Sequence, residues 1–281
     1  FHLHIGAHKT ATTHLQATLI KHRTDLARAG VQFERPDDIR AVIGPGRRAA
    51  VQMGPIPSFR RTGASRRLAQ MDQRQERLVV SDENSLGLCP ERFQRELLYP
   101  TACRRMTVWR RLAGQRQTIV YLCIRNYAAF FSGAFVQTIR NKSVFAPDAA
   151  CLSAIAEMPR RWGDVIGDIR RALPDAQLRI WTFEDHQAVL PTLLHEQTGL
   201  DLQPVKRRPM ATPSSAAVAA FRKVARKRRL PLDQYAKQHP ITDENPKFSL
   251  WTAEQSATLI EMYQDDVTTL CHDLGEDFLR A

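Results

Sequence analysis

The sequence has no long run of apolar residues and few cysteines, and both absences exclude whole classes of protein. No segment approaches the roughly 20 apolar residues that a bilayer-spanning helix needs, so we expect no transmembrane segment. The first residues lack the basic region and long apolar core of a signal peptide. The five cysteines form no CxxC pair, which argues against a disulfide framework and a zinc ribbon. We therefore expect mostly buried thiols and a cytoplasmic, reducing location.

Metal-binding patterns and internal repeats are also missing. The nine histidines form no HExxH pair, and no carboxylate stands at ligand spacing near them, so we expect no metal. With 43% hydrophobic residues, 13 Gly and 16 Pro in 281 residues, the chain is not collagen-like, low-complexity or disordered. A chain of this length can bury a sizeable core in one large domain.

Positive charge is in excess, and it is concentrated in two stretches. The chain holds 41 Lys and Arg against 29 Asp and Glu, a net charge of +12, which indicates an anionic partner. Residues 40–77 carry a net +7 and residues 206–230 a net +9. The cluster at 222–229 raises a nucleic-acid-binding alternative. A solvated helical face is the preferred interpretation, because no nucleic-acid-binding motif accompanies the cluster and only 7% of residues are aromatic.

Apolar segments alternate with helical patterns along the chain, which predicts an α/β fold. The strand candidates are almost continuously apolar, as in a parallel sheet covered on both faces. We expect helices over 13–29, around Trp162–Leu173 and after a capping box at Thr252, the last one burying Ile260 and Tyr263. Residues 40–77 predict loops and short helices. The predicted strands are Phe1–Ile5, Val31–Phe33, Leu78–Ser81, Thr118–Ile124 and Gln177–Phe183.

The stretch from Gly6 to Thr13 joins the first predicted strand to the first predicted helix. Exposed N–H groups and the helix dipole favour a phosphate at such a place, and Lys9 adds a point charge. The stretch is not a Walker A loop, because Lys9 lies only three residues after Gly6 and follows His8. An ordinary ATPase or kinase is therefore disfavoured, although a nucleotide kinase-like protein remains an alternative.

The segment from His4 to Gln16 resembles the 5′-phosphosulfate-binding loop of sulfotransferases that use 3′-phosphoadenosine-5′-phosphosulfate (PAPS). It is especially similar to the bacterial branch, which often begins Gly-x-His-Lys-Thr. The family usually has glycine where Ala11 stands, and alanine fits there if the position does not need a positive φ. The resemblance implies a P-loop-like three-layer fold with a mostly parallel sheet flanked by helices. It also implies that PAPS is bound by Gly6, His8, Lys9, Thr10, Ala11, Thr12 and Thr13.

A second motif resembles the family's 3′-phosphate site, in which a strand ends in arginine and the next helix carries a serine. Arg125 ends the strand candidate Thr118–Ile124, and its planar fork suits phosphate oxygens. The family serine usually lies eight residues later, where this chain has Gly133, and Ser132 stands one residue before it. One step along a helix rotates a side chain by about 100°. The resemblance implies that Arg125 binds the 3′-phosphate and makes Ser132 the candidate partner.

The resemblance extends over nearly the whole chain as a single sulfotransferase-like domain. This domain includes an Arg-rich insertion at about 40–77 and a helical C-terminal part at about 213–281. The family reaction is in-line transfer of a sulfuryl group from PAPS to a hydroxyl or amine. The oligomeric state is left open, and the charge excess in 40–77 and 206–230 suggests an anionic carbohydrate acceptor. Catalytically inactive PAPS-like scaffolds are a further alternative.

Two residues are assigned to catalysis. Lys9 is suited to stabilising charge on the leaving phosphate and the transferring group. Glu83 is the candidate base, because functional side chains gather at the carboxyl ends of strands in open α/β sheets. The alternative is that Asp82 and Glu83 cap the following turn, and His8 is the second candidate base.

Overall fold

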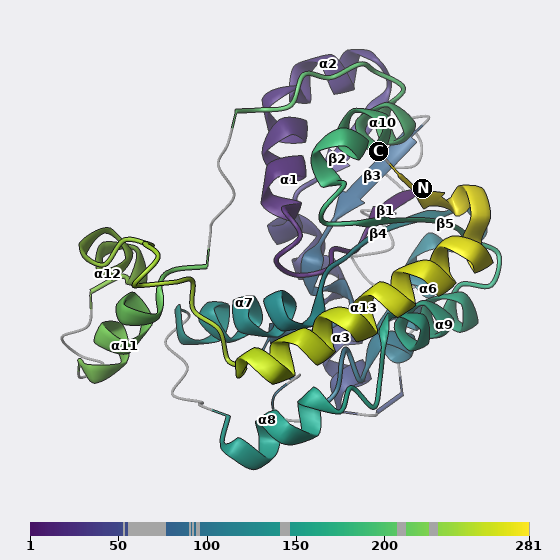
Figure 1. Ribbon diagram of the computed structural model, residues 1–281. Coiled ribbons are helices and arrows are strands. Elements are labelled where there is room, and N and C mark those ends of the chain that lie inside the picture. Colours follow the sequence, from purple (N-terminus) through teal and green to yellow (C-terminus); the bar gives the residue numbers. More distant parts are fainter. Residues whose placement is uncertain are drawn as a thin grey trace.

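The computed structural model describes residues 1–52, 54–55, 77–89, 91, 93, 96–140, 147–206, 212–224 and 230–280. At its centre lies a six-stranded sheet in which each strand pairs in parallel with its neighbours (Figure 1). The parallel arrangement confirms the predicted α/β class. From one edge to the other, the strands are β2 (Val31–Glu34), β3 (Arg77–Ser81), β1 (His2–His4), β4 (Ile119–Ile124), β5 (Gln177–Thr182) and β6 (Phe278–Leu279).

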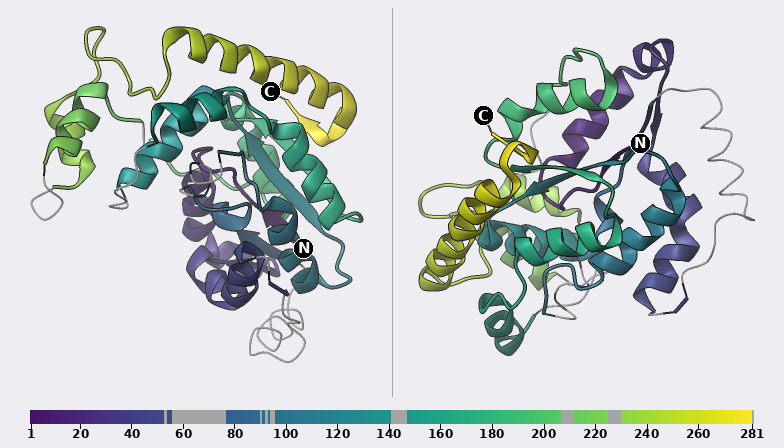
Figure 2. Two further views of the ribbon diagram at one scale, coloured as in Figure 1. Left: turned by 90° about the horizontal axis from the view of Figure 1, so that it is seen from below. Right: turned by 90° about the vertical axis from the view of Figure 1, so that its right-hand side faces the viewer.

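Helices cover both faces of the sheet, which makes three layers (Figure 2). Neighbouring residues of one strand face opposite layers: Leu122 lies in the large core cluster, whereas Cys123 packs with Val189 and Leu193. The first layer holds α1 (Thr12–Lys21), α2 (Arg23–Arg28) and α10 (His186–Thr198). The second holds α3 (Pro36–Val51), α6 (Ala102–Ala113), α7 (Tyr127–Arg140), α9 (Trp162–Ala172) and α13 (Ala253–Leu274).

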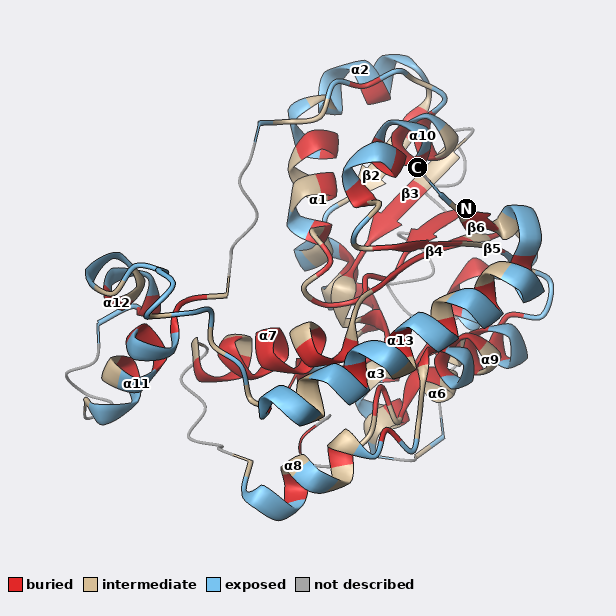
Figure 3. Cartoon of the chain, in the orientation of Figure 1, coloured by how far each residue is buried: buried red, intermediate tan, exposed pale blue. Residues whose placement is uncertain are grey.

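Three short helices lie at the margin of these layers. They are α8 (Ala149–Ala156), α11 (Ser215–Lys223) and α12 (Leu232–Gln238), and 3₁₀ turns occupy Glu83–Ser85 and Gly275–Asp277. Figure 3 shows β1, β4 and α7 almost wholly buried, whereas α12 and the outer side of α13 face solvent. Within the described residues, no helix is long and apolar enough to cross a membrane.

The strand predictions are confirmed to within two residues at each end, but two helix predictions are wrong. The segment 13–29 forms two helices that meet at His22, whose ring nitrogens contact Asp25 and the Gln203 carbonyl. Residues 40–51 belong to the long helix α3 instead of to loops, because Ile39 and Ile43 bury one face in spite of Pro45. The predicted loops at 56–76 fall outside the described residues.

The last helix starts as predicted. Thr252 Oγ1 accepts from the Gln255 N–H (3.2 Å), and the Gln255 side chain accepts from the Thr252 N–H (3.1 Å), which completes the capping box. The burial prediction is right for Tyr263 and wrong for Ile260, which is 39% exposed; Leu259 takes the buried position. None of the five cysteines forms a disulfide, and three of them are buried.

The strand order places a change of direction at β1. After β1 the chain passes over β3 to form β2 and returns to form β3, and it then continues on the other side of β1 with β4, β5 and β6. Ligands of open α/β sheets bind beyond the carboxyl ends of the strands at such a switch point. Here these ends bring together Glu83 after β3, the loop after β1 and Arg125 after β4.

Candidate anion-binding site

The loop after β1 is fixed by its neighbours on both sides. Ala7 donates its N–H to the Cys123 carbonyl (3.0 Å), and the Cys123 N–H donates to the Gly6 carbonyl (2.8 Å). Gly6 has a φ of +104°, and a Cβ added there would lie 3.2 Å from the Cα of Glu83. Glycine is therefore required where the loop passes the residue that follows β3.

The backbone from Lys9 to Ala11 has a left-handed residue at each end. Lys9 (φ 63°) and Ala11 (φ 61°) are left-handed and Thr10 between them is not, the alternation that makes an anion-binding nest. In the described part of the chain, the N–H groups of residues 9 and 11–13 donate to no protein acceptor. These N–H groups can bind an anion at the N-terminus of α1.

Alanine is expected to fit at position 11 only if this position does not need a positive φ, and the structure shows that it does. The φ of Ala11 is positive, so this position favours glycine, and the left-handed conformation costs an L-residue about 1–2 kcal/mol. Two of the loop threonines stabilise this conformation, because Thr10 Oγ1 (2.7 Å) and Thr12 Oγ1 (3.3 Å) both donate to the Ala7 carbonyl. The backbone N–H group of Thr12, more than its hydroxyl, is available to a ligand, and Thr13 is exposed beside it.

Lys9 and Arg125 meet at this loop. A Cβ added at Gly133 would lie 3.1 Å from Lys9 Cγ and 3.3 Å from Lys9 Cε, so the lysine side chain lies across α7 at its glycine. The Arg125 guanidinium donates to the Lys9 carbonyl and stacks on the ring of Phe183, 4.3 Å from its centroid. The two cations thus converge on the loop from different strands of the sheet.

Both of these cations are half-buried, and within the described residues neither forms an ion pair with a carboxylate. Most other half-buried arginines do form one; Arg40 and Arg160 are examples. Burial lowers the pKa of Lys9, and the Arg140 and Arg125 charges lower it further, against smaller opposing effects of Cys89 and Asp233. A bound anion would offset the cost of burying these charges.

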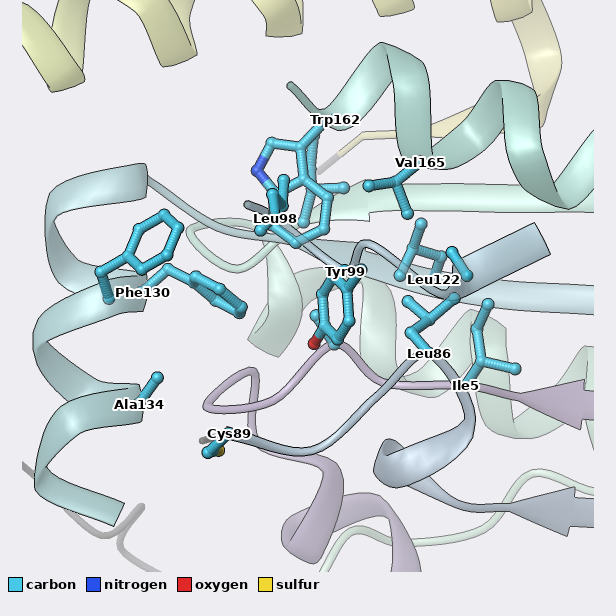
Figure 4. Packing of buried hydrophobic residues seen from close by; sticks show 14 of the residues in the cluster. Ile5, Leu86, Cys89, Leu98, Tyr99, Leu122, Phe130, Ala134, Trp162 and Val165 are labelled. Carbon is cyan, nitrogen blue, oxygen red and sulfur yellow. The ribbon is translucent and has the colours of Figure 1, made fainter. Parts of the chain in front are cut away.

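His8 holds the loop to the rest of the protein. Its Nδ1 lies 3.0 Å from the Tyr99 hydroxyl, which also accepts from the His8 N–H (3.0 Å), and its Nε2 lies 3.0 Å from Asn84 Oδ1. In Figure 4 the Tyr99 hydroxyl points out of the apolar core toward this loop. Since both ring nitrogens are engaged, the geometry favours a supporting role for His8. Tyr99 could not be predicted from the sequence, because it lies 91 residues away in an irregular segment with no recognisable pattern.

Glu83 lies beside Gly6 and has a partner on each carboxylate oxygen. Arg40 Nη2 donates to Oε1 (3.0 Å), and Gln16 Nε2 donates to Oε2 (3.2 Å). Asp82, and not Glu83, caps the turn, because its Oδ1 accepts from the Asn84 N–H (3.2 Å). Glu83 thus has a fixed orientation next to the loop, which a base at this site requires.

Asp82 is fully buried and forms the centre of a charged cluster behind Glu83. Arg40 Nε donates to Asp82 Oδ1 (2.9 Å), and Arg47 Nη1 donates to Oδ2 (3.3 Å). Burial raises the pKa of the Asp82 carboxyl, and the two arginines oppose this rise. Both arginines come from α3, the helix that the sequence analysis did not predict.

The structure does not turn Ser132 toward Lys9. Ser132 is buried, and its Oγ accepts from the Leu250 N–H (3.2 Å) on the side of α7 that packs against residues 248–251. Gly133, one residue later, faces Lys9. This is the rotation of about 100° per residue that a regular helix imposes. Binding of a 3′-phosphate by Ser132 stays a prediction. The Ser132 hydroxyl already accepts a hydrogen bond from the backbone N–H of Leu250.

Comparison with known proteins adds no relative. The sequence matches no family model, no curated protein and no solved structure. Among the residues described, no group of three or more His, Cys, Asp or Glu side chains could hold a metal ion. The loop after β1 brings together backbone N–H groups, one lysine and one arginine, a set of groups that can bind an anion.

Proposed function

We propose that this chain is a PAPS-dependent sulfotransferase that transfers a sulfuryl group to a hydroxyl or amine of an acidic carbohydrate. The observation that carries the proposal is the meeting of Lys9 and Arg125 at the loop after β1. Both cations are half-buried and have no carboxylate partner among the described residues, and the N–H groups of residues 9 and 11–13 beside them donate to no described acceptor. The location at the sheet's switch point and the sequence similarity of both segments to the family motifs support it.

Each site residue has a role in this proposal. PAPS supplies the sulfuryl group and leaves as adenosine 3′,5′-bisphosphate. Lys9 and the loop N–H groups bind the phosphosulfate oxygens and stabilise the charge that develops there, and Arg125 takes the 3′-phosphate through its planar fork. Glu83 accepts the acceptor's proton as the new O–S (or N–S) bond forms and the bond from sulfur to the 5′-phosphate oxygen breaks. Arg40 and Gln16 hold Glu83 in place for this step.

Ligand-dependent thermal stability tests the proposal against its two alternatives. Adenosine 3′,5′-bisphosphate at a hundred times its Kd should stabilise the protein by about 2.7 kcal/mol without magnesium. For a chain of this size that is a rise in Tm of roughly 5–10 °C. A nucleotide kinase relative would respond to ATP with magnesium instead, and a nucleic-acid-binding protein would respond to an oligonucleotide. Either of these responses, with none to the bisphosphate, would refute the sulfotransferase proposal.

A further inference from the structure

Arg140 extends the positive surface of the site beyond the residues that the family motifs include. It ends α7 and lies seven residues, or about two helical turns, after Gly133. Residues spaced by seven share one face of a helix, so Arg140 lies on the same face as the glycine that Lys9 crosses. The electrostatic effect of Arg140 on Lys9 exceeds that of Arg125.

A carboxylate from another part of the chain holds Arg140. Arg140 Nη2 contacts Asp233 Oδ1 of α12 at 2.8 Å. The arginine side chain is 16% exposed, whereas the aspartate side chain is 64% exposed, so the carboxylate approaches from the solvent side. Only the aspartate side of the pair is open to water, so the carboxylate loses little burial when it leaves. An incoming ligand oxyanion can replace it, because the oxyanion then compensates the largely buried charge of Arg140.

The helices α11 and α12 are positioned to present Asp233 at this place. They form a separate lobe beyond the C-terminal end of α7 (Figure 1). The segment that follows them is attached to α7 by Phe248, whose ring stacks on Phe135 with centroids 5.5 Å apart. The lobe thus places one acidic side chain against Arg140, at the end of the helix face that Lys9 crosses.

We propose that Arg140 is a third cationic ligand of this site, and that Asp233 occupies it until an oxyanion of a substrate displaces the aspartate carboxylate. The ligand chemistry is a phosphate, sulfate or carboxylate group. It is carried either by the donor nucleotide or by an acidic acceptor. Only the identity of the ligand rests on the proposed function, because the geometry predicts binding of any small oxyanion.

Titration with inorganic pyrophosphate tests the site independently of the reaction. Arg140→Gln should weaken pyrophosphate binding about tenfold, the loss of one charge-assisted hydrogen bond of about 1.4 kcal/mol. Asp233→Asn removes the competing carboxylate and should tighten binding severalfold. Asp243→Asn is the matched control, because it makes the same change of charge at an exposed aspartate near α12 that has no contact with Arg140 among the described residues. Its affinity should stay within twofold of the original.

Two further titrations distinguish the sources of the oxyanion. A tenfold loss of affinity for adenosine 3′,5′-bisphosphate in Arg140→Gln assigns the arginine to the nucleotide. Unchanged nucleotide affinity, with loss of the preference for a sulfated over an unsulfated oligosaccharide, assigns it to the acceptor. The proposal is overturned if Arg140→Gln and Asp233→Asn bind all three ligands as the unchanged protein does. If pyrophosphate affinity rises in Asp233→Asn and falls in Arg140→Gln while adenosine 3′,5′-bisphosphate binds to none of the proteins, the sulfotransferase proposal fails and the Arg140 site stands.

Discussion

Replacing Ala11 with glycine should stabilise the protein, which is unusual for a substitution to glycine. Ala11 lies at φ 61° and ψ 20°, a left-handed conformation that costs an L-residue about 1–2 kcal/mol. Glycine removes this cost but adds about 0.4–1 kcal/mol of conformational entropy to the unfolded chain. The net expectation for Ala11→Gly is a gain of about 0.5–1 kcal/mol in the free energy of unfolding.

The matched control is Ala17→Gly, in the middle of the helix that Ala11 precedes. Ala17 is half-buried within α1 and has a helical backbone, so glycine there should cost about 1 kcal/mol. Urea denaturation of both variants measures the two changes, which should have opposite signs. A loss of stability in Ala11→Gly similar to that in Ala17→Gly would show that the loop backbone is not left-handed at this position. The loop would then lack a left-handed residue that an anion-binding nest requires.

Three further predictions concern the candidate base, the lysine and the buried histidines. Glu83→Gln should lower kcat about a hundredfold and leave nucleotide affinity unchanged; unchanged turnover would assign the base elsewhere. Gly133→Ala should weaken bisphosphate binding several fold by displacing Lys9, because the added Cβ would lie 3.1 Å from Lys9 Cγ, and unaltered binding in calorimetry would contradict the packing of Lys9 on α7. Burial lowers the pKa of His4 to about 3 and that of His186 to about 4, so the folded state resists their protonation. The contribution of these two neutral histidines to the free energy of unfolding should be complete above pH 6.5. It should fall as the pH drops, by roughly 2 kcal/mol for each histidine at pH 5. Urea titrations at pH 7 and pH 5 measure this loss, and a His186→Gln variant with the same loss would assign it to other groups.

The strands and the central loop could be predicted from the sequence because their signals are local. A strand that is buried on both faces must be apolar almost throughout, which made segments such as Leu78–Ser81 recognisable. The loop from Gly6 to Thr13 combined a glycine, a lysine and threonines between a strand and a helix. The end of each strand then indicated Glu83 and Arg125, and the sheet order brings both to the loop.

The residues that support the site could not be predicted in the same way, because they come from distant segments. Tyr99 and Arg40 reach His8 and Glu83 across 91 and 43 residues, and nothing in their own surroundings marks them. Helix α3 forms in spite of Pro45 because its apolar face packs on the core. The left-handed backbone of Ala11 is likewise a property of the folded loop, which the residue type does not reveal.

Calorimetry of adenosine 3′,5′-bisphosphate without magnesium shows whether the loop after β1 and Arg125 bind a nucleotide. The unchanged protein should bind it, and Lys9→Ala and Arg125→Ala should each lose ten- to a hundredfold in affinity, about 1.5–3 kcal/mol for a hydrogen bond to a charged group. Arg171→Ala is the control, since Arg171 is 71% exposed and pairs with Asp168 away from the loop, and its affinity should not change. The proposed nucleotide site would be contradicted if the unchanged protein did not bind the bisphosphate. It would also be contradicted if Lys9→Ala and Arg125→Ala both bound it as tightly as the unchanged protein does.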